Sequence, residues 1–177
     1  MTAPLVAVAV AVAVAVVVVA CSKPAPPAAG PGDTVPANPA SSSLAPASAP
    51  QSGPSGATLE VDTGAGAASY TVGNWRPVPL DAQVIPAKGV MYSVDVRIVA
   101  NTGTVAFNGF YFVARSADGA TVAPAVGAVR PGITSGQLSP GQSVEGHVAF
   151  DFAPGTAVTG VVLRDPAGEQ VAFWSVS

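Results

Sequence analysis

Apolar and polar residues alternate with a period of two through the second half of this 177-residue chain. From Val90 to Thr102, the longest run after Thr58 without Pro or Gly, the apolar residues take the even positions and polar ones most of the odd positions. Residues 143–152 repeat the alternation. This period places one set of side chains on each face of a half-buried strand. The pattern therefore predicts β-strands and leaves no room for a long helix.

Turn-forming residues separate most of the expected strands. Further strands are expected at residues 105–114, 158–163 and 170–176, with weaker ones at 58–62, 70–75 and 120–123. Asp118-Gly119 is the strongest hairpin signal, and the other turns are expected at Pro131-Gly132, Pro140-Gly141, Pro154-Gly155 and Asp165 to Gly168. Seven or eight short antiparallel strands within residues 58–177 predict an all-β fold, a β-sandwich.

An apolar run opens the chain and ends at its only cysteine. Residues 4–20 are all Pro, Leu, Val or Ala, and the run closes on Val18, Val19, Ala20 and Cys21. This ending resembles the lipobox of bacterial lipoproteins, in which the thiol receives a diacylglyceryl group and the preceding peptide is removed. We therefore expect a lipoprotein signal peptide at residues 1–20 and a lipid anchor on Cys21 that holds the protein to the outer face of the cell membrane.

Two alternatives to a lipobox stay open, a plain signal peptide and an uncleaved membrane helix. The apolar run is marginal for a bilayer core of roughly 30 Å, and a membrane helix would leave the position of Cys21 unexplained. The first four residues contain no Lys or Arg, which secretory signals normally carry. Once Cys21 is acylated no thiol remains for a disulfide, so the fold depends on its own core.

The composition changes abruptly after the cysteine. All but seven of the 36 residues from Ser22 to Ala57 are Pro, Ala, Ser or Gly. Such a segment buries too little apolar surface to offset the entropy of ordering it. We expect residues 21–57 to be a lipidated, disordered spacer, although unselected low-complexity sequence would look the same. Residues 58–177 are then the folded domain.

The charged residues exclude several classes of function. Residues 58–177 contain six Lys or Arg and nine Asp or Glu, without clustering, which argues against nucleic acid as a partner. His147 is the only histidine, on the outward face of its strand beside Glu145 and Asp151, where it is either a solvated residue or a general base. One histidine and no free thiol are too few for a zinc site. No catalytic residue, metal ligand or cofactor is expected.

Aromatic residues offer one candidate contact surface. If residues 105–114 form a single strand, Phe110, Phe112 and Ala114 face the core while Phe107 and Tyr111 face outward. Phe107 and Tyr111 are therefore the candidate surface for a partner. The alternative is that the segment between Val122 and Leu138 covers them. Trp75 and Trp174 are expected to anchor the core.

Several ordered motifs carry a resemblance to a known family. They are Gly73-Asn74-Trp75-Arg76, Val84-Ile85-Pro86, Phe112 to Gly119, Ile133-Thr134-Ser135-Gly136, Pro140-Gly141-Gln142, Gly146 to Asp151 and Phe173-Trp174. Together they resemble the small immunogenic (immunoprotective) extracellular proteins of mycobacteria and relatives. The resemblance implies an immunoglobulin-like β-sandwich that is secreted and antigenic, without an established activity. The lipobox and spacer are a departure from that family.

Two classes of function follow for a tethered domain. In the first, it is a surface-displayed, non-catalytic binding, adhesion or antigenic module that recognises a protein or glycan through its loops or a strand edge. In the second, it is an accessory envelope lipoprotein that binds an apolar ligand, such as a lipid, between its sheets. A large cavity lined by Phe, Val and Leu would favour the second class, and a filled core with an exposed aromatic patch the first.

Overall fold

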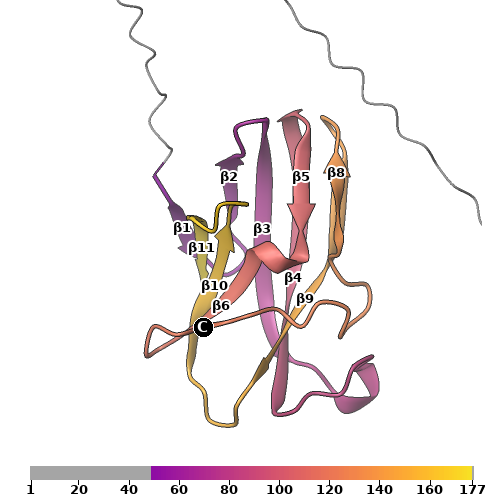
Figure 1. Ribbon diagram of the computed structural model, residues 1–177, viewed down its shortest axis with the longest axis vertical. Coiled ribbons are helices and arrows are strands. Elements are labelled where there is room, and N and C mark those ends of the chain that lie inside the picture. The colour runs from indigo at the N-terminus through magenta and orange to yellow at the C-terminus, as the bar shows by residue number, and fades with distance from the viewer. Residues whose placement is uncertain (1–48, 177) are drawn as a thin grey trace, which may run out of the picture. The chain divides into compact units, whose positions relative to one another are not determined.

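Eleven strands and two short 3-10 helices form the regular structure of residues 49–176, the part of the chain that the computed structural model describes (Figure 1). The strands are β1 (Gln51–Pro54), β2 (Thr58–Asp62), β3 (Gly66–Pro77), β4 (Val90–Gly103), β5 (Val105–Asn108), β6 (Phe112–Ser116), β7 (Thr121–Val122), β8 (Ser135–Leu138), β9 (Ser143–Phe152), β10 (Val158–Arg164) and β11 (Gln170–Ser175). The 3-10 helices are η1 (Leu80–Ala82) and η2 (Gly109–Tyr111).

The strands build an all-β sandwich. One sheet has the order β1-β11-β10-β6-β7 and the other β2-β3-β4-β9, while β5 and β8 form a separate two-stranded ribbon. Every pairing in these sheets is antiparallel except that of β1 with β11. The predicted fold class is confirmed. The expected count of seven or eight strands is too low, because short strands were missed and one expected strand is divided.

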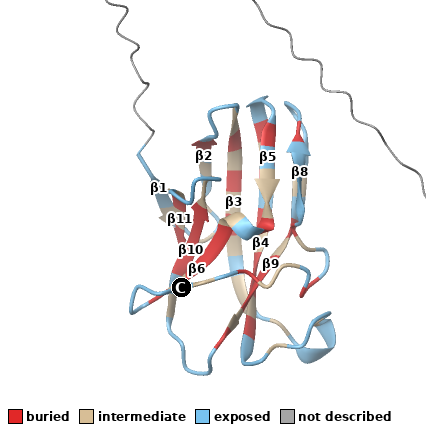
Figure 2. Cartoon of the chain, viewed as in Figure 1, coloured by how far each residue is buried: buried red, intermediate tan, exposed pale blue. Residues whose placement is uncertain are grey.

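The alternation in β4 and β9 sets the two faces of the second sheet. Val94, Val96 and Ile98 are at most 2% exposed, and Phe150 on β9 is fully buried. The buried positions of both strands belong to one hydrophobic core between the sheets. Figure 2 shows burial concentrated on the strands, with exposed residues at the turns and around η1. The predicted parity is confirmed for these residues, whereas Tyr92 is only half-buried and Val90, at the start of β4, is 38% exposed.

The hairpin expected at Asp118-Gly119 is also confirmed. The backbone N–H of Ser116 donates to the carbonyl of Ala120 at 2.9 Å, and the Asp118 carboxylate accepts the N–H of Ala120 at 3.1 Å. Gly119 has a φ of +86°, which favours glycine because it has no Cβ. Glycines with positive φ also occupy the turns at Gly141, Gly155 and Gly168.

The expected strand at residues 105–114 is divided by η2. Asn108 accepts the N–H of Phe110 through its side chain at 3.0 Å, and a Cβ on Gly109 would lie 2.5 Å from the carbonyl oxygen of Ile133. The cap from Asn108 and the close approach of Gly109 to Ile133 end β5, and β6 begins at Phe112. Phe112 and Ala114 face the core as expected, but Phe110 is 64% exposed, so its predicted inward position is wrong.

Residues 51–57 belong to the sandwich. β1 pairs in parallel with β11, the Gly56 N–H donates to the carbonyl of Val72 at 2.8 Å, and the indole N–H of Trp174 donates to the carbonyl of Ala57 at 2.8 Å. The fold therefore begins at Gln51 rather than at Thr58, because partners far along the chain order a segment of weak local preference. The predicted signal peptide, Val18, Val19, Ala20, Cys21 and the spacer up to residue 48 lie outside the described residues.

A second, smaller hydrophobic cluster covers part of the outer face of the β4–β9 sheet. Met91 and Ala149 pack there against Ala128 and Val129 of the segment that follows β7. Val78 and Ala87, from the loop between β3 and β4, pack on the same cluster. Two long loops are therefore fixed to the sandwich by apolar contacts.

Candidate functional site

His147 lies on β9 directly across from Asp95 of β4. Its Nδ1 is 2.7 Å from Asp95 Oδ1. The carboxylates expected beside it have other partners, because Glu145 pairs with Arg97 at 2.9 Å and Asp151 accepts two backbone N–H groups. The histidine is thus paired with a carboxylate that the alternation along its own strand did not indicate.

Asp95 is the centre of this polar cluster. It accepts the side-chain N–H of Asn74 at 2.7 Å and lies 2.8 Å from the guanidinium of Arg76. Partial burial raises the pKa of Asp95, but the hydrogen bonds from Asn74 and Arg76 and the nearby charges of Arg76 and His147 together hold that pKa below its ordinary value. Asn74 has a φ of +54° within the irregular pairing of β3 with β4.

The arrangement suits a structural role. The cluster joins β3, β4 and β9 on the outer face of their sheet, and both Asp95 Oδ1 and His147 Nδ1 are shielded from solvent. Within residues 49–176, no group of three or more His, Cys, Asp or Glu is placed to hold a metal ion. None of the helices in the same range has the length and hydropathy needed to cross a bilayer.

Phe107 and Tyr111, the predicted contact surface, are both half-buried and pack against the main core. The Phe107 ring lies against Gly136 of β8, where an added Cβ would approach the ring to 2.9 Å. Phe107 therefore packs against its cross-strand neighbour on β8, which belongs to the segment between Val122 and Leu138. Tyr111 lines a cleft, and the exposed aromatic residue of this region is Phe110.

The cleft has a volume of about 670 Å³ and lies at one end of the sandwich. It is lined by Val61, Asp62, Thr63, Gly64, Ala65, Tyr70, Thr104, Ala106, Tyr111, Gln137, Leu163, Arg164, Asp165, Pro166 and Val171. The β2–β3 hairpin and the β10–β11 hairpin, which belong to different sheets, supply most of its walls. Its volume is in the range of small-molecule sites.

Apolar as well as polar residues line the cleft. Val61 and Leu163 are buried and line the cleft together with the half-buried Val171. Burial, with a smaller contribution from the Tyr111 phenol, raises the pKa of Tyr70 to about 12. The Tyr70 hydroxyl therefore stays protonated at neutral pH.

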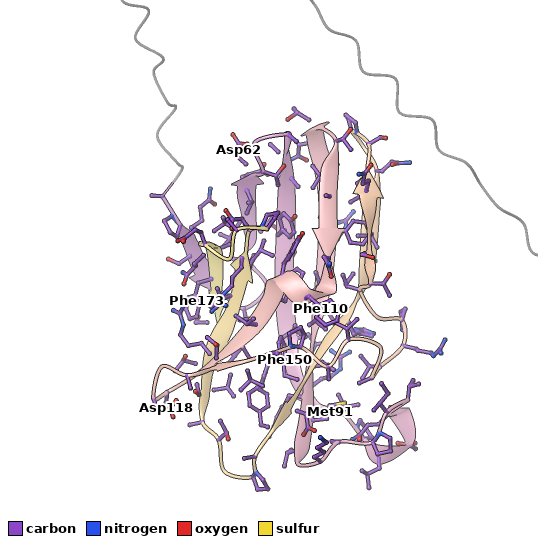
Figure 3. The ribbon with its side chains drawn as sticks, in the orientation of Figure 1. Asp62, Met91, Phe110, Asp118, Phe150 and Phe173 are labelled. Atoms are coloured by element: carbon purple, nitrogen blue, oxygen red, sulfur yellow. The ribbon has the colours of Figure 1, made fainter. Side chains whose placement is uncertain are left out.

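A second candidate surface is the loop between β3 and β4, which the sequence analysis missed. Leu80 is 84% exposed, Ile85 54% and Val84 46%. The apolar residues between the prolines of this loop are visible in the sequence. Val84-Ile85-Pro86 contributes there only to the family resemblance and does not predict a contact surface. Figure 3 labels Asp62 beside the cleft at the upper end of the sandwich and Met91 near this loop at the lower end.

The exposed loop is held firmly to the domain. The Gln83 side chain donates to the Val78 carbonyl at 3.0 Å and accepts the Ala87 N–H at 2.9 Å, which braces the loop from within. The Val84 N–H donates to the Ala128 carbonyl at 2.8 Å. The loop thus presents its apolar side chains in a defined conformation.

Comparison with known protein families identifies the family of this chain. A family model described as "Domain of unknown function (DUF1942)" matches residues 50–174. The chain belongs to this family. The match begins within one residue of β1, which agrees with a fold that starts at Gln51. No curated protein matches the chain.

Two solved structures share the fold. The crystal structure of MPT63, a secreted protein from Mycobacterium tuberculosis, is 23% identical with a TM-score of 0.64 and covers 73% of this chain and 99% of that one. The yjhA protein from Bacillus subtilis is 15% identical with a TM-score of 0.53, covering 72% of this chain and 99% of that one. These likenesses support the expected immunoglobulin-like sandwich. At these identities they concern the fold alone.

Proposed function

We propose that this member of the family is a non-catalytic binding module, tethered by a lipid on Cys21 to the outer face of the cell membrane, that docks a protein partner through residues 78–89. The apolar run ending at Cys21 supports the anchor. The fold shared with a secreted protein supports a place outside the cytoplasm. A single acyl chain gives marginal anchoring, whereas the two chains of a diacylglyceryl group hold a protein stably.

The observation that carries docking is the exposure of Leu80, Val84 and Ile85 on a braced loop. Exposed apolar side chains that cluster on a soluble domain mark interaction sites. Because hydrogen bonds already hold the loop, binding would order few further residues, and the entropic cost of association is correspondingly small. The three side chains would supply the apolar centre of the interface.

The charges of the loop favour a protein over an anionic membrane. Between Val78 and Gly89 there is one acidic residue, Asp81, and one basic residue, Lys88. A membrane-binding loop combines apolar residues with an excess of Lys and Arg, which this loop lacks. Figure 1 shows η1 at the lower end of the sandwich, whereas the chain enters β1 in the upper half. The loop is thus directed away from the start of the fold.

Photo-crosslinking from the loop in cells tests this function. A photoreactive residue at Leu80 of the full-length, acylated chain is expected to capture a discrete protein, whereas one at Thr121, exposed on β7, is not. A Leu80→Asp, Ile85→Asp double variant should lose at least about 2 kcal/mol of binding to that protein and keep its melting temperature. Identical products from both positions, or full binding by the double variant, would contradict docking at the loop.

A second candidate function is the binding of an apolar ligand within the sandwich, and the cleft favours it. The core between the sheets is filled by large side chains such as Phe150 and Trp174, so the space for a ligand is at the end of the sandwich. Binding at the cleft and docking at the loop would use opposite ends of the domain. Both functions are therefore compatible with one tethered module.

A further inference from the structure

Among the residues that the structure describes, no side-chain hydrogen bond or ion pair is found for Arg164, one of the three charged residues of the cleft. The other two charged residues there are engaged, since Asp62 accepts the Gly64 N–H and Asp165 accepts the Glu169 N–H, each at 2.8 Å. Within residues 49–176, the ion pairs found join Arg76, Arg97 and His147 to carboxylates, and none includes Arg164. Arg164 is a half-buried residue that lines the cleft beside apolar residues. A guanidinium in such surroundings is stabilised when an anion pairs with it.

The position of Arg164 follows from the end of β10. The pairing of β10 with β11 shifts register between Leu163 and Arg164, and the β10–β11 turn begins at Asp165. Leu163 is 3% exposed and belongs to the core, whereas Arg164 is half-buried and lines the cleft. An apolar residue, Leu163, and a positively charged residue, Arg164, are therefore neighbours in the wall of the cleft.

The remaining walls match an elongated apolar chain. Val61 and Val171 line the interior from β2 and β11, one from each sheet. Tyr70 and Tyr111 also line the cleft. A phenol that stays protonated at neutral pH can donate a hydrogen bond to an anionic oxygen.

We propose that the cleft binds a single-chain amphiphile with a carboxylate head, the head pairing with the Arg164 guanidinium and the alkyl chain packing between Val61, Leu163 and Val171. Guanidinium and carboxylate match in a planar, two-point geometry. The chain gains affinity from each methylene that it buries. This inference names the ligand class of the second candidate function and does not depend on docking at residues 78–89.

Calorimetric titration of residues 22–177, which retain every described residue and lack the acylation site, tests the inference. The probes are octanoate, decanoate and dodecanoate below their micelle concentrations, with 1-dodecanol as the uncharged counterpart. Affinity is expected to rise about fourfold per buried methylene, the equivalent of about 0.8 kcal/mol, until the cleft is full. Dodecanoate should bind more tightly than 1-dodecanol.

Two variants separate the head from the chain. Arg164→Gln is expected to weaken dodecanoate about tenfold and to leave 1-dodecanol within about twofold. Ala106→Phe adds a ring at an exposed position of the cleft wall and should weaken both probes. Arg130→Gln removes an exposed charge outside the cleft and should change neither.

Three results would overturn the inference. They are equal affinity for dodecanoate and 1-dodecanol, an Arg164→Gln variant that binds dodecanoate normally, and the absence of binding by the unsubstituted chain. If Ala106→Phe lowers the melting temperature, Arg164→Gln decides the matter alone, because it changes a half-buried polar side chain outside the core. A failure here leaves crosslinking from Leu80 unaffected, so the two proposals fail separately.

Discussion

Trp174 is the best single position at which to test how the N-terminal strand is held. The side chain is 1% exposed, and its residue lies opposite Val161 of β10 and Gly53 of β1. Its indole N–H donates to the carbonyl of Ala57 at 2.8 Å. The same side chain thus fills the core and fixes the segment that follows β1.

Two substitutions at Trp174 separate these roles. Trp174→Ala removes the ring and is expected to cost about 3–5 kcal/mol through lost burial and the cavity left behind. Trp174→Phe retains most of the apolar volume but loses the donor to Ala57, so we expect a cost of about 1–2 kcal/mol. A domain of this size has a total stability of about 5–15 kcal/mol, so the alanine variant should be severely weakened.

Urea unfolding of residues 22–177, followed by circular dichroism, measures both variants. At about 4 °C per kcal/mol, Trp174→Ala should also lower the melting temperature by roughly 12–20 °C. Thr121→Ala, an exposed position on β7, serves as the control and should change stability by no more than about 0.5 kcal/mol. A cost below about 1 kcal/mol for Trp174→Ala would refute its place in the core. Equal costs for both variants would refute the separate contribution of the hydrogen bond.

Three further predictions concern the N-terminal region and the polar cluster. Deleting residues 49–57 should lower the melting temperature by several degrees, because β1 and the hydrogen bond from Trp174 to Ala57 are lost. A nearly unchanged melting temperature would show that the stable domain begins at Thr58. Cys21→Ser should remove the protein from the detergent phase in phase partitioning, and unchanged partitioning would refute the lipid anchor. Because the pKa of Asp95 is lowered in the folded state, its contribution is complete at neutral pH and is lost as the pH falls through that pKa. Acid unfolding of Asp95→Asn should therefore depend less on pH between about pH 5 and pH 2 than that of Asp81→Asn, an exposed control.

Local patterns were sufficient for β4 and β9 and for most of the turns, but not for β3, of which only residues 70–75 were expected. β2 and β9 have the predicted bounds, and β4 differs by one residue at its end. The alternation in β4 and β9 reports directly which side faces the core, since a strand has only two faces. The Asp-Gly and Pro-Gly signals act within four residues, so they too can be read without knowledge of the rest of the fold.

Contacts between distant residues explain the errors. Nothing local in the Pro- and Ser-rich neighbourhood of β1 favours a strand, and β11, at the other end of the chain, supplies its pairing. Residues 105–114 alternate well enough for one strand, but the approach of Gly109 to Ile133 and the cap from Asn108 divide them. Tertiary contacts overrode a reasonable local preference in both places.

The candidate sites depend on the tertiary structure to different degrees. His147 was identified as an isolated histidine, yet its partner Asp95 is set by the register of β4 with β9 rather than by its own strand. The cleft brings together turns that are about a hundred residues apart in the chain, so no local motif indicates it. The exposure of Leu80 could not be predicted either. An apolar loop residue has the same sequence pattern whether other residues cover it or it lies in solvent.

The sequence by itself determined the all-β class, the parity of the main strands, the position of most turns and the prediction of an anchor at Cys21. These properties depend on residues close together in the chain, where period and turn chemistry act. Only the tertiary structure decided where the fold begins, which aromatic residues are exposed and that Arg164 lines a cleft with apolar residues. Those properties depend on which surfaces meet when the two sheets pack, and the same local pattern is compatible with several such arrangements.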